Sequence, residues 1–256
     1  TIGGRELFVT PSIGITLFPF DDHTSDELLR NADTAMFDAK EQGGNCFRFY
    51  TAEMNARAGR RLTLETGLRH ALERGEFLLH YQPQVDLVSG EILGAEALIR
   101  WQHPDWGLVS PAEFVSLAEE TGLILPIGEW VLAEACTQAR IWHDAGYAGL
   151  RIAVNLSGRQ LAQKNLVETV AATLTRCAVA RGVLELEITE SLLMQDLEQT
   201  AGTLEALAAL GVTVSMDDFG TGHSSLACLR RFPIDVIKID RTFVNSLSGH
   251  EGRDGE

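Results

Sequence analysis

The chain has 256 residues, with 21 Lys and Arg against 36 Asp and Glu, so its formal net charge is −15. Apolar residues make up 45% and charged residues 22%, the balance of a folded globular chain rather than a disordered one. This acidic composition argues against non-specific binding to nucleic acid or to an anionic membrane, because both need a basic surface. The composition does not exclude binding of an anionic small molecule, since a bound metal can invert the local electrostatic field.

The four cysteines are scattered, and none forms a C-x-x-C pair, which argues against a zinc ribbon or a redox pair: Cys46, Cys136, Cys177 and Cys228. We expect buried thiols in a reducing compartment. No uncharged apolar run reaches about 18 residues, and no signal peptide is evident, so we expect no membrane span in the chain. Because the first residue is not Met, we expect a piece of a longer protein.

The first 50 residues alternate strand and helix signals. Short β-forming runs cover residues 7–10, 12–17 and 47–50. Thr24 with Glu27 forms a capping-box pattern that predicts a helix from about Ser25, and Gly43-Gly44 ends it. Residues 51–75 mix five Arg with spaced Leu and contain no Pro, which indicates a helical linker into a second domain.

From Phe77 onward, apolar runs alternate with helical stretches, which predicts a mostly parallel sheet with right-handed crossovers. The strand candidates are 77–82, 92–101, 151–157, 183–190, 212–218 and 235–240, and helical stretches include 111–143, 161–181 and 192–210. This is a (β/α) barrel pattern with six strands. A further βα unit needs about 30 residues, whereas only 16 follow Asp240, so we expect strands seven and eight to be absent and two strand edges to be open for pairing.

Several predicted strands end in polar residues, and in a (β/α) barrel these ends converge on the face where chemistry is done. The strongest pattern is Asp217-Asp218 followed by a glycine-rich loop. Adjacent carboxylates repel, and a shared divalent cation removes that cost. The alternative is a solvated acidic turn. The loop lacks a P-loop lysine and a Gly-x-Ser-x-Gly elbow, and the other protein-kinase motifs are missing.

Carboxylate and amide oxygens at these ends suit magnesium or manganese better than zinc: Glu96, Asn155, Glu187 and Asp217. Lys238 shares a strand face with Val236, and that face is the barrel interior or rim. It could serve in catalysis or form an ion pair with Asp217 or Asp240. We interpret the seven histidines as structural, and Trp130 and Trp142 as core residues.

Residues 62–247 resemble the EAL domain, the bacterial cyclic-di-GMP phosphodiesterase family. Its name-giving motif stands here as Glu96-Ala97-Leu98. Eight blocks match in the right order: 81–86, 96–101, 103–104, 111–114, 155–157, 187–191, 217–226 and 238–240. The resemblance implies an α/β fold, a TIM-like (β/α) barrel that lacks its last two strands here.

Residues 1–50 resemble the C-terminal half of a GGDEF, or diguanylate cyclase-like, domain. Residues 12–15, 28–36 and 39–40 carry this likeness, and the block that names the domain is missing. Gly43-Gly44-Asn45 stands in place of the family's Gly-Arg-Asn. We therefore expect no cyclic-di-GMP synthesis from this half. The expected limits are 1–50 for this remnant, 51–61 for the linker, 62–247 for the EAL domain and 248–256 for a tail.

The resemblance also implies roles for matching residues. A first metal would be bound by Glu96, Asn155, Glu187 and Asp217, and a second by Asp217 and Asp218, as a two-metal Mg²⁺ or Mn²⁺ site. Lys238 would position the attacking water, and Glu190 would anchor the loop 219–225. The residues expected to contact substrate are Gln82, Leu98, Arg100, Pro111 and Asp240, and those in the catalytic group are Glu96, Asp217, Asp218 and Lys238.

The implied reaction is in-line attack on one phosphodiester of cyclic-di-GMP by water that the metals activate, giving the linear dinucleotide pGpG. The family's later Glu-Gly-Val-Glu and Gln-Gly blocks are absent, so whether this chain is active without the last two strands stays open. Two alternatives stay open: a non-catalytic cyclic-di-GMP receptor, and a fold fragment that pairs its open edges. We expect a cytoplasmic setting without DNA binding; membrane anchoring of a parent protein and homodimerisation through the EAL unit stay open.

Overall fold

The computed structural model describes residues 10–193, 197–220 and 231–247. The chain divides into two compact units, residues 1–67 and residues 68–256. Each unit is described by itself below. The predicted strand at 7–10, the loop after Gly220, Cys228, His223 and the tail from 248 fall largely or wholly outside the described residues. The domain limits expected from the sequence stay predictions.

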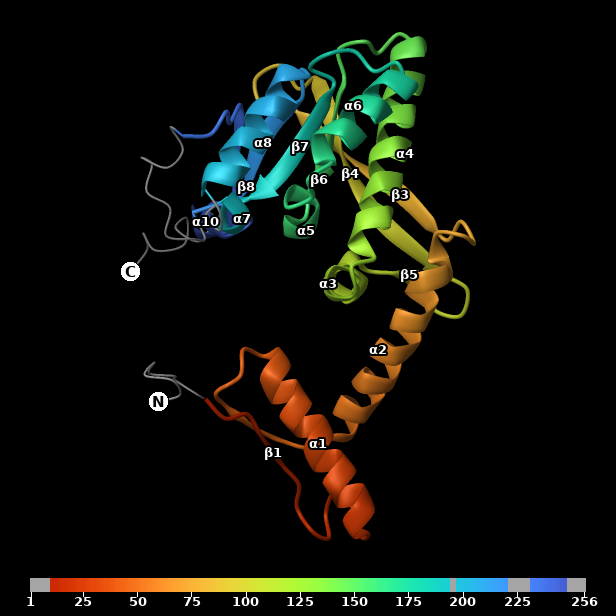
Figure 1. Cartoon of the computed structure of the whole chain (residues 1–256), viewed down its shortest axis with the longest axis vertical. Coiled ribbons are helices and arrows are strands. Elements are labelled where there is room, and N and C mark those ends of the chain that lie inside the picture. The colour runs from red at the N-terminus through yellow and green to blue at the C-terminus, as the bar shows by residue number, and fades with distance from the viewer. Residues whose placement is uncertain (1–9, 194–196, 221–230, 248–256) are drawn as a thin grey trace, which may run out of the picture. The chain divides into compact units, whose positions relative to one another are not determined.

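The first unit is a small parallel sheet with one helix on it. Strand β1 (Ile13–Ile15) pairs with β2 (Phe47–Phe49), and α1 (Ser25–Glu41) packs against them (Figure 1). The helix approaches so closely that a Cβ at Gly14 would lie 1.9 Å from the Ala32 carbonyl oxygen. Glycine at this position therefore allows the contact. Helix α2 (Ala52–Ala71) follows, as the linker pattern predicted.

Helix α1 begins and ends where the sequence predicted. Thr24 is the N-cap, and its hydroxyl oxygen accepts a hydrogen bond from the Glu27 N–H (3.3 Å). The predicted capping box forms only in part, because the Glu27 carboxylate accepts from the Thr24 hydroxyl, while the Thr24 N–H donates to Asp22. Gly43 and Gly44 follow the helix with φ of 101° and 69°, a left-handed backbone that favours glycine.

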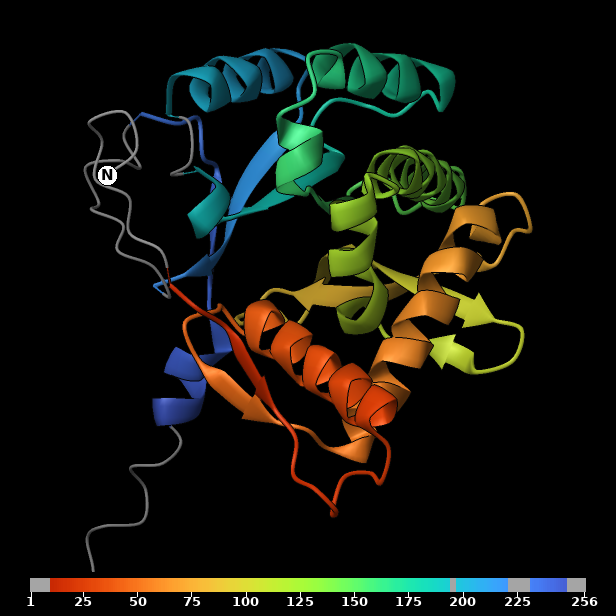
Figure 2. The same cartoon turned by 60° about the horizontal axis from the view of Figure 1, so that its bottom comes forward.

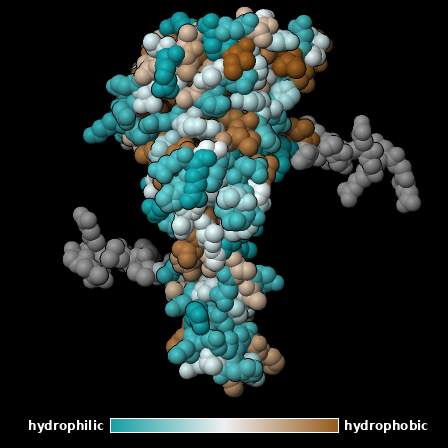
Figure 3. All heavy atoms as spheres, turned by 90° about the vertical axis from the view of Figure 1, so that its right-hand side faces the viewer, coloured by the Kyte–Doolittle hydropathy of each residue, from teal (hydrophilic) through white to brown (hydrophobic). Residues whose placement is uncertain are grey.

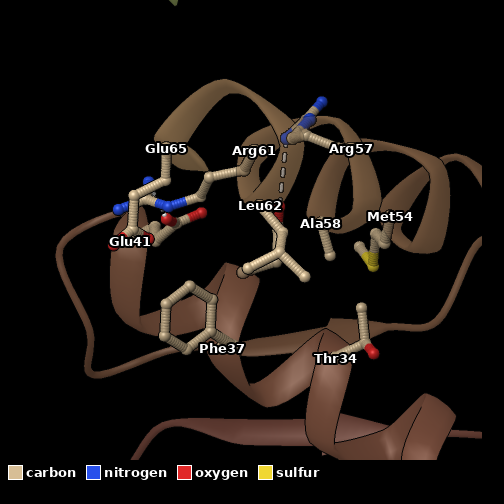
Figure 4. Close-up of a pocket in the computed structure, with 10 residues that line it drawn as sticks. Thr34, Phe37, Glu41, Met54, Arg57, Ala58, Arg61, Leu62 and Glu65 are labelled. Atoms are coloured by element: carbon tan, nitrogen blue, oxygen red, sulfur yellow. Dashed lines mark hydrogen bonds and ion pairs between the residues drawn. The ribbon is translucent and has the colours of Figure 1, made fainter. Parts of the chain in front are cut away.

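Ion pairs join α1 to the first half of α2 around a small pocket (Figure 4). Arg57 Nη1 lies 3.1 Å from Asp38 Oδ1, and Arg61 Nη1 lies 2.5 Å from Glu41 Oε1. The pocket measures about 220 Å³ and belongs to the first unit. None of the site residues predicted from the sequence lines it.

The second unit is built on a mostly parallel sheet. Its strands are β3 (Phe77–Val85), β4 (Ile92–His103), β5 (Gly107–Val109), β6 (Arg151–Asn155), β7 (Leu184–Thr189), β8 (Thr213–Phe219) and β9 (Val236–Ile239). The spatial order is β3-β4-β6-β7-β8-β9, with β5 added to β4. Strand β3 runs antiparallel to β4, which alternation of strand and helix did not reveal, while β4, β6, β7, β8 and β9 are parallel. The TIM-like α/β architecture is thus confirmed, but barrel closure is not detected among the described strands.

Helices cover the outer face of this sheet, and short helices follow the carboxyl ends of several strands (Figures 1 and 2). They are α3 (Pro111–Thr121), α4 (Ile124–Asp144), α5 (Gly158–Leu161), α6 (Leu166–Arg176), α7 (Glu190–Leu193), α8 (Leu197–Ala209) and α10 (Arg241–Leu247). The single helical stretch predicted for 111–143 was wrong. Gly122 has a φ of 79° and ends α3, because a left-handed residue breaks the helical hydrogen-bond ladder.

Alternating side chains separate the core from the polar interior of the sheet. Leu186 and Ile188 on β7, with Val214 and Met216 on β8, are at most 1% exposed and face the helices.

Figure 3 shows mostly polar residues on one outer surface, with single apolar residues between them. None of the described helices is long and apolar enough to cross a membrane. Cys136 is buried as expected, whereas Cys46 and Cys177 are only partly buried; all three are free thiols.

Candidate active site

Five neighbouring parallel strands place one predicted site residue each on the same face of the sheet. Glu96 lies on β4, Asn155 on β6, Glu187 on β7, Asp217 on β8 and Lys238 on β9. The register pairs Glu96 with Ala153, two residues before Asn155, and pairs Glu187 with Ser215, two residues before Asp217. Steps of two residues keep side chains on one face, since strand side chains alternate. The structure therefore brings together side chains that are up to 142 residues apart.

Lys238 is the centre of this cluster. Its Nζ donates to Glu187 Oε2 at 2.6 Å, to Glu96 Oε2 at 3.0 Å and to Asp217 Oδ2 at 3.1 Å. Of the two partners that the sequence suggested, only Asp217 makes an ion pair with Lys238; Asp240 does not. The three bonds satisfy all donors of the ammonium group.

The donor set also fits a hard divalent cation. Every donor is a carboxylate or amide oxygen, which magnesium and manganese prefer. Asn155 Nδ2 donates to Glu96 Oε1 at 2.7 Å, which leaves the Asn155 carbonyl oxygen for another partner. Glu187 Oε1 is buried and has no hydrogen-bond partner in the described part of the chain. Among the described residues, no group of three His, Cys, Asp or Glu side chains is arranged to hold a metal ion. Instead, the Lys238 ammonium group lies between the three carboxylates.

Burial controls the protonation of the cluster. It raises the pKa of Glu187 to about 7, while the charges of Glu96 and Asp217 add to this rise and Lys238 limits it. For Lys238, burial lowers the pKa, but hydrogen bonds and attraction from Glu187 and Glu96 outweigh it. The pKa of the Lys238 ammonium is therefore above its ordinary value, so the group stays charged. A buried carboxylate that is half-protonated near neutrality is a common feature of functional sites.

The end of β8 turns sharply at the paired aspartates. Asp218 has a φ of 55°, which non-glycine residues rarely adopt, and its N–H donates to Asp217 Oδ1 (2.9 Å). Burial raises the pKa of Asp218, and the charges of Asp217 and Asp240 raise it further. Buried Glu190 accepts a hydrogen bond from the Gly220 N–H at 2.8 Å, so it holds the start of the loop; the rest of that loop lies outside the described residues.

The residues predicted to contact substrate surround the same face. Gln82 on β3 pairs directly with Glu96 across the antiparallel register. Leu98 and Arg100 follow Glu96 on alternate positions of β4, and Arg100 Nη1 donates to the Ile99 carbonyl (2.8 Å). Asp240 lies after β9, and hydrogen bonds from Thr242 lower its pKa.

A cavity of about 550 Å³ adjoins the cluster and is lined mainly by apolar residues. Three predicted site residues lie on its wall, namely Leu98, Pro111 and Asn155. Sequence reasoning missed Gln160, which lines the same cavity and forms a capping box with Ser157. The Ser-x-x-Gln spacing at 157–160 was a signal that could have revealed it. His103 shapes its loop as expected, because its Nδ1 accepts from the Asp105 N–H (3.1 Å).

Comparison with known proteins defines the family. The model described as "EAL domain" matches residues 65–254, and the one described as "Diguanylate cyclase, GGDEF domain" matches residues 1–46. The chain therefore belongs to the EAL domain family, preceded by a segment that matches GGDEF domains.

Several relatives are similar over nearly the whole chain. It is 49% identical over 253 residues to the bifunctional diguanylate cyclase/cyclic di-GMP phosphodiesterase MucR of Pseudomonas aeruginosa, covering 99% of this chain and 37% of MucR. It is 43% identical over 246 residues to the cyclic di-GMP phosphodiesterase PdeR of Escherichia coli, covering 96% and 37%. The chain spans about a third of the length of these relatives.

Solved structures share the fold of the second unit. The MucR phosphodiesterase in complex with c-di-GMP matches with a TM-score of 0.71 and 51% identity, over 74% of this chain and 76% of that one. The FimX EAL domain of P. aeruginosa bound to c-di-GMP matches with a TM-score of 0.66 and 27% identity, over 72% and 74%.

Replacing Lys238 with Met should destabilise the metal-free chain by about 1.5–3 kcal/mol, the usual range for hydrogen bonds to charged groups. The substitution leaves three converging carboxylates without a counter-charge. Because a divalent cation supplies that charge, added Mg²⁺ should recover part of the loss. Urea unfolding with chelator and then with Mg²⁺ measures both effects. Equal stability of wild type and variant in chelator would contradict the central role of Lys238.

The raised pKa of Glu187 predicts a pH dependence of stability in the metal-free chain. Its folded pKa, about 7, lies above the ordinary value of 4.5. The folded state therefore holds a proton that the unfolded state releases, and the free energy of unfolding falls as the pH rises from about 4.5 to 7. The Glu187→Gln variant cannot titrate at this position and should lack this part of the fall. Parallel stability profiles for the two proteins would rule out the predicted shift.

Proposed function

We propose that this chain hydrolyses one phosphodiester bond of cyclic-di-GMP to the linear dinucleotide pGpG in bacterial second-messenger signalling. The observation that carries this proposal is the convergence of Glu96, Glu187 and Asp217 on Lys238 at one face of the sheet. The names of the similar proteins MucR and PdeR support it. Because the chain spans about a third of those relatives, the activity of the whole protein is part of the proposal.

The proposed site holds two Mg²⁺ or Mn²⁺ ions. Glu96, Asn155, Glu187 and Asp217 would bind the first ion, and Asp217 with Asp218 would bind the second. Such ions, when bound, supply Lewis-acid stabilisation of the charge that develops on the phosphate oxygens. The unpartnered Oε1 of Glu187 and the all-oxygen donor set support this assignment.

The residues of the chain contribute positioning and charge. Lys238, which stays charged, would give up one of its three carboxylate bonds and donate that hydrogen bond to the oxygen of the attacking water. The water loses a proton as its oxygen bonds to phosphorus, the bond from phosphorus to the ribose 3′-oxygen breaks, and the leaving oxygen takes up a proton, so one water is added across the bond. Gln82, Leu98, Arg100, Pro111 and Asp240 would hold the dinucleotide, and Glu190 would fix the loop beside it through Gly220.

The proposed setting is cytoplasmic, because cyclic-di-GMP hydrolysis serves signalling inside the bacterial cell. We propose no DNA partner, since a net charge of −15 disfavours binding to a polyanion. A homodimer through the EAL unit is a further proposal, to be tested by the mass of the protein in solution.

Replacing Glu96 with Gln should lower the rate of pGpG formation by more than about a hundredfold, since even the outer partners of metal ligands typically contribute 10–100-fold. Chromatography of cyclic-di-GMP incubated with the protein and Mg²⁺, then Mn²⁺, measures the product. Glu168→Gln is the matched control, because Glu168 is exposed on α6. Undiminished hydrolysis by Glu96→Gln would refute the proposal. Binding of cyclic-di-GMP by the wild type without turnover would favour the receptor alternative.

A further inference from the structure

The turn after β6 is closed by the side chain of Gln160. Its Oε1 accepts hydrogen bonds from the Ser157 N–H (3.1 Å) and from the Ser157 hydroxyl (2.8 Å). The Ser157 hydroxyl oxygen in turn accepts from the Gln160 N–H (3.3 Å). These reciprocal bonds form a capping box at the start of α5. They fix the backbone two residues after Asn155, where the chain leaves the sheet.

Asn155 depends on this backbone for its orientation. It is the last residue of β6, and its side chain is exposed, so core packing does not hold it. Its Nδ2 nevertheless donates to Glu96 Oε1 at 2.7 Å. On one side the Leu156 N–H is bound by the Glu187 carbonyl (2.8 Å), and on the other the capping box orders Ser157. The backbone that carries Asn155 toward Glu96 is therefore restrained on both sides.

Gly128 in α4 gives an independent observation. Glycine is disfavoured inside helices, yet a Cβ at this position would lie 2.0 Å from Gln160 Nε2 and 2.6 Å from its Cδ. The Gln160 side chain thus fills the space that a larger residue at 128 would need. Relief of that clash requires the amide to move, and the amide is the group that bonds to Ser157. Gln160 is only 8% exposed, so the space around it is closed.

We infer that Gln160 is a positioning residue for Asn155, and that Gly128 provides the room for it. The inference rests on the proposed function, in which Asn155 is a ligand of the first metal. Gln160 acts through Ser157 and the backbone between Ser157 and Asn155. It orients the side-chain oxygen of Asn155, which is exposed and has little packing to hold it.

The test measures the affinity of the protein for Mn²⁺ by titration calorimetry without substrate, together with kcat and KM for cyclic-di-GMP. Gln160→Ala should weaken Mn²⁺ binding by about tenfold, as removal of groups behind metal ligands usually does. Gln160→Glu keeps the oxygen acceptor of the capping box and should keep the wild-type affinity. Retention of full affinity by Gln160→Ala would overturn the inference.

Gly128→Ala is the second variant, and it decides the question if Gln160→Ala does not fold. Alanine favours the helix, so weaker Mn²⁺ binding in this variant would not come from loss of α4. We expect it to match Gln160→Ala. The matched control is Gly202→Ala in α8, where a Cβ would meet nothing within 4 Å. Equal affinities of Gly128→Ala, Gly202→Ala and wild type would contradict the inference.

A double-mutant cycle separates positioning from a general structural role. In an Asn155→Ala background, Gln160→Ala should cause no further loss of affinity, because its effect passes through Asn155. An unchanged effect in that background would overturn the inference. If Asn155→Ala alone leaves Mn²⁺ binding unchanged, the proposed metal site itself fails, and the inference fails with it. If only Gln160→Ala and Gly128→Ala are silent, the proposed function stands and this inference alone fails.

Discussion

The interaction on which the site depends is the contact of one ammonium group with three carboxylates. Glu96, Glu187 and Asp217 come from three different strands and would repel one another without a cation between them. Lys238 on the edge strand β9 supplies that charge. Because its three partners lie on β4, β7 and β8, the charge balance of the site depends on the order of the strands from β4 to β9. A divalent cation can provide the same neutralisation, which is why the cluster fits both a lysine and a metal.

The register between the parallel strands brings these carboxylates close to Lys238. Strands β7 and β8 present polar residues to the interior and apolar residues to the helices, so one register controls both the core and the site. On β7 this alternation buries Leu186 against the helices and Glu187 in the interior, each about 1% exposed. Such burial is what raises the pKa of Glu187. The same β-sheet geometry therefore provides the stability of the unit and the unusual protonation of its central carboxylate.

Much of this arrangement could be predicted from local sequence patterns. Alternation in residues 236–240 placed Lys238 on the interior face, and strand-end polar residues indicated one cluster at the carboxyl ends. Other features depend on three-dimensional contacts that no local pattern contains. Two such features are the antiparallel pairing of β3 and the contacts of Lys238 with Glu96 and Glu187. Both depend on the register between neighbouring strands, which no local sequence pattern specifies. The fit of Gln160 against Gly128 depends on the packing of α5 against α4, so the glycine alone did not reveal it.

The most direct measurement is the anomalous diffraction of crystals of this protein grown with Mn²⁺. The central claim is that carboxylates from β4, β7 and β8 form one cation site that Lys238 shares. The account predicts an anomalous peak among Glu96, Asn155, Glu187 and Asp217, with Lys238 Nζ moved away from at least one carboxylate. If Lys238 keeps all three bonds and no peak lies at these residues under saturating Mn²⁺, the claim is contradicted.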